Sequence, residues 1–298
     1  MPAVSLADLI RARVQRALVP AAVSLVPLIV DGRVAGRITP GRVHRLAEFT
    51  TVLERRGQAL ALAPGTPQAR SAALADVAAA LASEGALSAW RDERYAVAPT
   101  LDAPPWFELE RAAARYFGIR TYAAHVNGLV REPDRVTMWI ARRSATKAID
   151  PGMLDNLVGG GVAAGTSVAA TVVKECAEEA GIGATLAGRA RLMDTLHIVR
   201  LHPDGLQDEV VFAHDLWLPP DFAPANKDGE VTDHHRFTLK EVGERLANDE
   251  GAGAMTLDAA LVALTALLRE GTFADDRPGH AALDALLRDL AGLRVASG

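Results

Sequence analysis

The sequence predicts an α+β protein, in which an α/β/α sandwich follows a smaller N-terminal α+β unit. In the centre of the 298-residue chain several segments alternate apolar and polar residues, and helical patterns lie on both sides of them. Residues 99–105 contain three prolines, which predicts a linker because proline fixes φ and keeps its predecessor out of the helical region. We therefore expect two domains, at residues 1–105 and 106–298.

Turn signals and periodicity predict the elements of the N-terminal unit. Apolar residues at helical spacing indicate a helix at about 4–18, and Asp31-Gly32 between two alternating apolar runs indicates a hairpin. A helix at about 41–48 and a strand in QALALAP follow. Thr66-Pro67 then begins a helix that runs through Leu81, with Gly85 beyond its end.

The second domain is predicted in the same way. We expect a helix at about 107–117, strands in TYAAHVNGLV and RVTMWIARR, a glycine-rich loop and a helix at about 167–180. Strands at about 186–201 and 209–218 come next, followed by a strand-like VTDHHRF. Helices at about 239–248, 256–269 and 280–291 complete the sandwich.

Composition restricts the partners and the compartment. A formal net charge of −5 provides no basic field for a phosphate backbone, so no nucleic-acid partner is expected. The single cysteine, Cys176, excludes an intrachain disulfide framework and a multi-cysteine zinc site, and it predicts a reducing compartment, the cytoplasm by default. Three arginines interrupt the apolar stripe of the first helix, which excludes a membrane span or signal segment there.

An acidic cluster carries the strongest chemical signal. Glu175, Glu178 and Glu179 are spaced i, i+3 and i+4, so a helix places them on one face, with Cys176 on the other. Gly181 is placed to end this helix, and the helix dipole disfavours negative charge in its last turns. A hard divalent cation would offset that repulsion, and oxygen-only ligands favour Mg²⁺, Mn²⁺ or Ca²⁺ over zinc. The alternative is a solvated acidic face.

Three consecutive glycines precede this helix. Gly159, Gly160 and Gly161 would let a backbone carbonyl approach an ion closely, and we see no packing need for them in the sequence. They favour the metal site over the solvated face.

This stretch resembles the Nudix box, G-x5-E-x7-R-E-U-x-E-E-x-G-U, in which U is aliphatic. The matching residues are Gly160, Glu175, Glu178, Glu179, Gly181 and Ile182. Thr166 replaces the first Glu, Lys174 replaces the Arg that usually braces the loop, and Cys176 takes an aliphatic position. The resemblance implies a Nudix hydrolase with Mg²⁺, or Mn²⁺, held by Gly160, Glu175, Glu178 and Glu179, with Lys174 also in the catalytic set.

The resemblance extends over most of the chain. FELERAAARYFGIRTYAAHVNGLV, KECAEEAGI and the N-terminal WRDERYAV are similar to the Nudix branch related to the Nudix part of fungal thiamine pyrophosphokinase proteins. What this implies is hydrolysis of thiamine diphosphate analogues, especially oxidised forms, to their monophosphates. The phosphorus that is attacked is not predicted.

Residues outside the box complete the expected site. A further carboxylate often joins a Nudix site as ligand or base, and Glu230 is the first choice, with Glu209 the second. Arg142 and Arg143 are candidates for binding substrate phosphate, although strand alternation sends them to opposite faces. Trp90, Tyr95 and Trp106 could stack on a heteroaromatic ring, or simply pack in the core.

The sequence also fits other functions. The chain could hydrolyse nucleoside diphosphate derivatives such as ADP-ribose, or bind a ligand without catalysis. An isomerase of prenyl diphosphates on the same fold would need a cysteine in the pocket, whereas Cys176 is predicted on the core side. We expect the first domain to cap the site or select the substrate, and a homodimer only by analogy.

Overall fold

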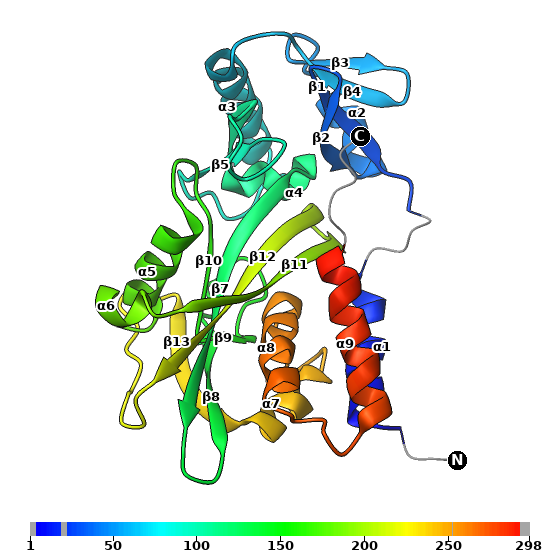
Figure 1. The fold of residues 1–298 in the computed structure, drawn as a ribbon. Helices are drawn as coiled ribbons and strands as arrows, with labels where there is room; N and C mark the ends of the chain where they lie inside the picture. The colour runs from blue at the N-terminus through cyan, green and yellow to red at the C-terminus, as the bar shows by residue number, and fades with distance from the viewer. Residues whose placement is uncertain (1–3, 19–22, 252, 293–298) are drawn as a thin grey trace.

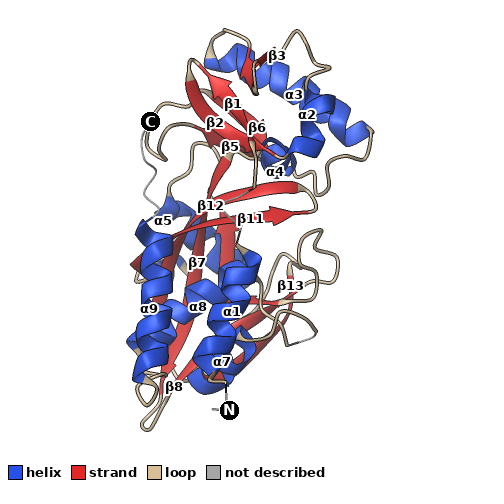
Figure 2. Cartoon of the chain, turned by 90° about the vertical axis from the view of Figure 1, so that its right-hand side faces the viewer, coloured by secondary structure: helices blue, strands red, loops and turns tan. Residues whose placement is uncertain are grey.

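The computed structural model describes residues 4–18, 23–251 and 253–292. The described residues form two lobes, which Figures 1 and 2 show one above the other. We call residues 23–119 the N-terminal lobe. The sandwich lobe consists of residues 120–292, without 252, together with the first helix, residues 6–17.

A four-stranded sheet and one long helix organise the N-terminal lobe. The strand order is β2-β1-β4-β3, with β1 Val26–Val30, β2 Arg33–Ile38, β3 Leu53–Arg56 and β4 Ala59–Leu62. The predicted hairpin is confirmed, because Asp31 and Gly32 adopt φ of 48° and 78° in the turn between β1 and β2. Helix α2 spans Pro40–Leu46, and α3, Pro67–Ser83, begins at Thr66, whose side chain accepts from the Ala69 amide as predicted.

The predicted helix at 107–117 is wrong over its first half. Phe107–Glu110 form strand β6, which pairs with β5, Arg94–Val97, so residues 98–106 connect two strands of one hairpin. Phe107 and Leu109 alternate into the core of the N-terminal lobe, and this period of two outweighs the helical propensity of the alanines that follow. A 3₁₀ turn at Arg111–Ala113 and helix α4, Ala114–Phe117, complete the stretch, and the same core continues to Ile119.

A seven-stranded sheet forms the middle of the sandwich lobe. Its main path is β11-β12-β7-β8-β13, while β10 pairs with β7 and β9 with β8. The strands are β7 Arg120–Arg131, β8 Val136–Arg143, β9 Leu154–Asn156, β10 Val158–Gly161, β11 Arg191–His202, β12 Gly205–Leu218 and β13 Val231–Thr238. Strand β7 is the axis of the arrangement, because it pairs parallel to β12 and antiparallel to β8 and β10.

Helices cover both faces of this sheet, which confirms the predicted α/β/α sandwich (Figure 1). Helices α5, Val168–Glu179, and α6, Ala184–Ala187, pack on one face. The other face is covered by α1 Leu6–Ala17, α7 Leu239–Leu246, α8 Leu257–Arg269 and α9 Arg277–Gly292. The alternation of β7 divides the two cores, since Ala124 and Val126 face α5 and Ala123 faces the opposite side.

Helix α1 forms where it was predicted, but it packs on the sandwich lobe beside α9 (Figure 2). Ile10 and Val14 are buried in the same core as Leu283 of α9. Arg13 fixes the helix further, because its guanidinium donates to the carbonyls of Leu246, at 2.8 Å, and Met255. The chain therefore starts in the sandwich lobe, crosses to the N-terminal lobe and returns.

This packing predicts a large difference between two neighbouring substitutions in α1. Ile10→Ala should lower the free energy of unfolding by about 2–5 kcal/mol, because it removes a side chain that is 1% exposed. Leu9→Ala is the matched control and should have an effect of about 0.5 kcal/mol or less, because Leu9 is 48% exposed. Chemical denaturation measures both. Equal effects would contradict the placement of α1.

Candidate active site

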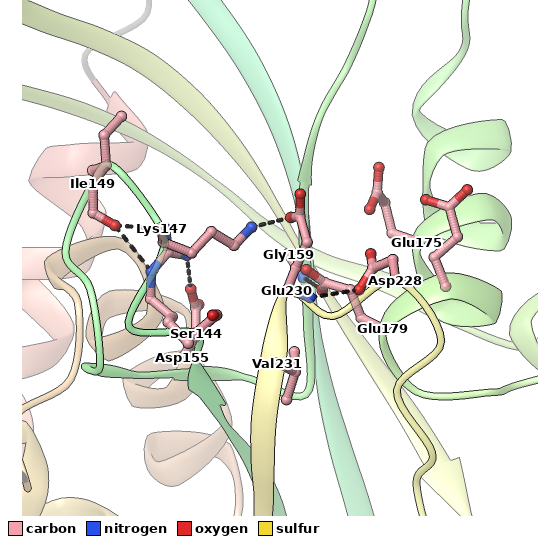
Figure 3. Close-up of polar contacts among 12 residues, drawn as sticks. Ser144, Lys147, Ile149, Asp155, Gly159, Glu175, Glu179, Asp228, Glu230 and Val231 are labelled. Atoms are coloured by element: carbon pink, nitrogen blue, oxygen red, sulfur yellow. Dashed lines mark hydrogen bonds and ion pairs between the residues drawn. The ribbon is translucent and has the colours of Figure 1, made fainter. Parts of the chain in front are cut away.

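Helix α5 presents the three glutamates of the box. It begins at Ser167, whose hydroxyl accepts from the Ala170 amide at 3.1 Å, and Gly181 follows its last turn with the left-handed φ of +67° expected there. Cys176 is fully buried on the core side, as predicted. Glu175 and Glu179 face strand β10, whereas Glu178 is more exposed (Figure 3).

The glycines before α5 form a strand rather than the predicted loop. Gly159, Gly160 and Gly161 belong to β10 and pair with His125, Ala124 and Ala123 of β7.

A packing need also explains these glycines, contrary to the interpretation of the sequence. A Cβ at Gly159 would lie 2.9 Å from the His125 ring, and Cβ atoms at Gly160 and Gly161 would overlap Glu175 and the Tyr95 hydroxyl. The missing side chains therefore make room for three partners from different elements.

Protein groups hold the carboxylates closely. Glu179 is 6% exposed and accepts from the Gly159 amide at 2.9 Å, and burial raises its pKa to about 8. Lys174 Nζ lies 3.0 Å from Glu175 Oε1 and 2.8 Å from Glu178 Oε2. Burial opposes the charge of Lys174, but these two hydrogen bonds raise its pKa overall. At this box position the single positive charge of the lysine thus offsets part of the negative charge of two glutamates.

These residues suit a hard divalent ion. Any Cβ at Gly160 would fill the space that Glu175 occupies, so the glycine lets Glu175 lie against the backbone of β10. Burial raises the pKa of both Glu175 and Glu179, so a nearby cation would offset the cost of their charges. No three acidic, histidine or cysteine side chains among the described residues converge enough to hold an ion alone. Mg²⁺ tolerates this, since it usually keeps waters and binds substrate phosphates beside one or two carboxylates.

Glu230 directly precedes β13, in a loop that contacts the end of α5, because the Lys227 amide donates to the Glu178 carbonyl at 2.8 Å. Figure 3 shows the side chain of Glu230 facing Lys147. Its carboxylate pairs with Lys147 and accepts from Arg91 of the N-terminal lobe at 2.8 Å. Burial alone would raise the pKa of Glu230, but Lys147 and then Arg91 lower it overall, so the group is ionised at neutral pH. The first-choice carboxylate is thus near the box, and an ion pair connects it to the other lobe.

A cavity of about 160 Å³ joins this site to both lobes. The glycines of β10 line it together with side chains from β5, the 3₁₀ turn, α4, β7, β12 and α8. Six of these side chains are Tyr95, Arg111, Arg115, His125, Glu209 and Asp258. Glu209, the second-choice carboxylate, accepts from Thr121 at 3.0 Å and from Gln207 at 2.8 Å.

The two candidate arginines lie apart, as strand alternation predicted. Arg143 lines the cavity, and its guanidinium is held by Asp155 at 2.7 Å and by the Ile149 carbonyl at 2.8 Å. Arg142 donates to the Gly152 carbonyl at 2.9 Å.

The three aromatic candidates also separate. Tyr95 lines the cavity, Trp90 is 42% exposed, and Trp106 packs against the core of the N-terminal lobe.

The sequence interpretation missed His125. Its Nδ1 lies 2.8 Å from Asn156 Oδ1, and the Asn156 amide donates to Asn127 Oδ1 at 3.1 Å, which fixes the ring beside Gly159. Since Asn156 Oδ1 can only accept, the proton is assigned to Nδ1, and Nε2 is left as an acceptor in neutral histidine. The available signal was weak: two polar residues at alternate positions within the apolar run TYAAHVNGLV.

The glycine cradle predicts a selective effect of Gly160→Ala. The new Cβ meets the flexible end of Glu175, so the glutamate should rotate away while the fold persists. We expect weaker Mn²⁺ binding by electron paramagnetic resonance, by about tenfold or more, with an unchanged thermal midpoint. Gly183→Ala is the control, because no atom lies within 4 Å of its added Cβ. Equal Mn²⁺ affinity in both variants would show that Glu175 is not a ligand.

Two family models match this chain in succession. A model described as a domain of unknown function, DUF4743, matches residues 10–121, and the NUDIX domain model matches residues 121–258. The matches meet close to the end of the N-terminal core at Ile119.

Solved structures resemble the sandwich lobe only distantly. A Deinococcus radiodurans protein has a TM-score of 0.43 and 20% identity, covering 57% of this chain and 97% of its own. The NUDIX domain of Shewanella oneidensis NrtR, complexed with ADP ribose, has a TM-score of 0.40 and 14% identity, covering 51% and 90%.

Two observations concern the predicted cytoplasmic location of this chain. No helix within the described ranges is long and apolar enough to cross a membrane. Two plant relatives are named as chloroplastic, so the cytoplasmic location stays a prediction for this chain.

Curated relatives match over most of the chain. Nudix hydrolase 24, chloroplastic, of Arabidopsis thaliana is 35% identical over 269 residues, which cover 89% of this chain and 73% of that protein. Nudix hydrolase 20, chloroplastic, of the same plant is 34% identical over 275 residues with the same coverage. An uncharacterized protein of Saccharomyces cerevisiae is 33% identical over 196 residues, covering 61% of this chain and 56% of its own. The chain belongs to the Nudix hydrolase family.

Proposed function

We propose that this protein hydrolyses a small organic diphosphate to its monophosphate, with Mg²⁺ or Mn²⁺ as the cofactor. One observation carries the proposal: the buried Glu179 and the part-buried Glu175 of α5 contact the glycines of β10, and those glycines line a cavity shared by both lobes. Such a site places acidic groups that could hold an ion next to a polar cavity that could receive part of a small ligand.

The proposed ligands are Glu175, Glu178, Glu179 and the Gly160 carbonyl. When held there, divalent ions would neutralise the diphosphate and lower the pKa of an attacking water. Lys174 keeps Glu175 and Glu178 together, because its ammonium contacts both. Arg143, and Arg142 from the other face of β8, are the proposed phosphate contacts.

We assign Glu230 the task of orienting or deprotonating the water, or of completing the ion's ligands. Its pairing with Lys147 and Arg91 supports this role, because it keeps the carboxylate ionised and fixed beside two residues that line the cavity.

The N-terminal lobe would cap the site. Arg91 reaches Glu230, and the Ala164 amide, between β10 and α5, donates to the Arg94 carbonyl at 2.8 Å. A cap of this kind excludes water from the reacting diphosphate. A homodimer stays a prediction by analogy.

Oxidised thiamine diphosphate is the proposed substrate on the resemblance alone, and ADP-ribose and related nucleoside diphosphates are the alternative. The isomerase alternative loses support, because Cys176 is fully buried and burial raises its pKa to about 12. A non-catalytic binding module stays as the other alternative.

A metal ligand should be essential for turnover and dispensable for folding. Glu179→Gln should lower kcat/KM by about 100-fold or more, since charge stabilisation worth roughly 3 kcal/mol is lost. Glu244→Gln, an exposed glutamate in α7, is the control and should leave kcat/KM unchanged. EDTA should stop the wild-type reaction, and Mg²⁺ or Mn²⁺ should restore it. Full activity of Glu179→Gln, or activity in excess EDTA, would refute the assignment.

A substrate panel should separate the candidate compounds. The purified protein with Mg²⁺ is given thiamine diphosphate, its oxidised forms, ADP-ribose, dinucleotides, nucleotide sugars, coenzyme A and prenyl diphosphates. We expect the highest kcat/KM for an oxidised thiamine diphosphate. Intact thiamine diphosphate should be poorer, because desolvating its thiazolium charge costs free energy that an uncharged ring avoids. A preference for ADP-ribose would remove the thiamine proposal alone, whereas tight binding without turnover would favour the binding module.

A further inference from the structure

We propose that one polar cluster in the cavity selects the substrate, by binding an organic group that carries a hydrogen-bond acceptor next to a donor. The cluster comprises Arg115 of the N-terminal lobe and Gln207, Glu209 and Asp258 of the sandwich lobe. A nitrogen heterocycle with an amino group beside a ring nitrogen has this pattern. The inference rests on the proposed function, because it assumes that the diphosphate lies at β10.

The cluster is within reach of a substrate whose diphosphate lies at β10. Both β10 and β12 pair with β7, so their register gives a common scale. Gly160 lies opposite Ala124, and Glu209 lies opposite Thr121. Three residues of β7 separate them along the strand, or about 10 Å, and two strand spacings, about 9.6 Å, separate β10 from β12 on the other side of β7, so they lie about 14 Å apart. A diphosphate joined to a heterocycle through a short linker or a sugar can span roughly this distance.

Gln207 fixes the polarity of the cluster. This side chain is 2% exposed, and its oxygen accepts from Arg200 at 2.6 Å and from Arg115 at 3.4 Å. Its amide nitrogen donates to Glu209 at 2.8 Å and to Asp258 at 2.9 Å. The hydrogen-bonding capacity of Gln207 is therefore used within the protein. Guanidinium donors lie on one side of the amide and carboxylate acceptors on the other.

Two buried atoms of the cluster lack a partner among the described residues. Arg115 Nη1 is an unmatched donor, and Asp258 Oδ1 is an unmatched acceptor. Buried polar groups left unpaired cost free energy, and they need an explanation in a native structure. A ligand that offers an acceptor to Arg115 and a donor to Asp258 would satisfy both, once the two side chains turn these buried atoms toward the cavity.

The charges of the cluster support the same ligand. Burial opposes ionisation of Asp258, but Arg200 and then the Gln207 hydrogen bond lower its pKa overall, so it accepts and does not donate at neutral pH. Arg115 can only donate. A prenyl chain offers neither an acceptor nor a donor, so its burial here would leave both groups desolvated and unpaired. The cluster therefore selects a polar heterocycle over a hydrocarbon.

The experiment measures binding without turnover, so it does not depend on catalysis. Titration calorimetry compares adenosine monophosphate and thiamine monophosphate, which carry an amino group beside a ring nitrogen, with phenyl phosphate, whose ring has neither donor nor acceptor. We expect at least one of the two heterocyclic monophosphates to bind the wild type about tenfold or more tightly than phenyl phosphate. The better of the two identifies the source of the heterocycle.

Substitutions assign this preference to the cluster. Asp258→Asn replaces an acceptor by an amide of the same shape, and Arg115→Lys keeps the charge but loses the fork of donors. Each should reduce the preference over phenyl phosphate to about threefold or less. Asp76→Asn and Arg55→Gln, exposed residues of the N-terminal lobe, are the matched controls and should retain it. Thermal unfolding verifies that each variant is folded, and the two cluster variants test the proposal independently.

The outcomes separate this inference from the proposed function. Equal binding of heterocyclic and phenyl monophosphates by the wild type, or an undiminished preference in a folded cluster variant, would overturn the inference. Selective binding that depends on the cluster, in a protein that hydrolyses no diphosphate, would support the inference as a ligand site and refute the proposed function instead.

Discussion

The close packing of α5 on the glycines of β10 is the constraint on which the rest of the site depends. Any side chain at Gly160 would displace Glu175, and the amide of Gly159 holds Glu179 in a buried position. Two carboxyl groups that prefer water are thereby kept together against a backbone, and burial raises the pKa of both. Lys174 offsets part of the repulsion between Glu175 and Glu178, because its ammonium bridges these two side chains. The lysine that departs from the family's box thus acts as a counter-charge on the helix surface.

Strand β7 connects this local packing to a cavity that the two lobes share. One of its faces meets α5, while His125 and Thr121 on the other face line the cavity. The N-terminal lobe closes the cavity through contacts that are polar and specific: Arg91 with Glu230, and Tyr95 in the space left by Gly161. Helix α1 crosses in the opposite direction and packs in the sandwich core. The lobes are therefore linked at two places, by α1 and by the polar contacts across the cavity. Two such links can keep the lobes in the fixed relation that a shared binding site requires.

Local signals predicted most elements, and long-range partners account for what they missed. The turn at Asp31-Gly32, the cap at Thr66 and the spacing of the three glutamates each depend on neighbours in sequence, and each forms as predicted. The strand at Phe107–Glu110 was missed because its pairing with β5 decides its conformation. The glycines of β10 were interpreted as a loop because their packing partners, His125, Glu175 and Tyr95, come from three separate elements. The cluster around Gln207 could not be predicted for the same reason, because its four partners come from separate elements between residues 115 and 258. Periodicity identifies which face of a helix is buried, but not which surface covers it, so the docking of α1 on α9 was out of reach.

The most direct test of the account is to locate the ion and the organic group together. A crystal of the full chain with Mn²⁺ and a non-hydrolysable heterocyclic diphosphate, in which a methylene replaces the bridging oxygen, would give both positions by anomalous scattering and difference density. We expect Mn²⁺ at the carboxylates of Glu175, Glu178 and Glu179 and the Gly160 carbonyl, with the heterocycle between Arg115 and Asp258. Mn²⁺ bound elsewhere, with the α5 carboxylates in contact only with Lys174 and Gly159, would contradict it.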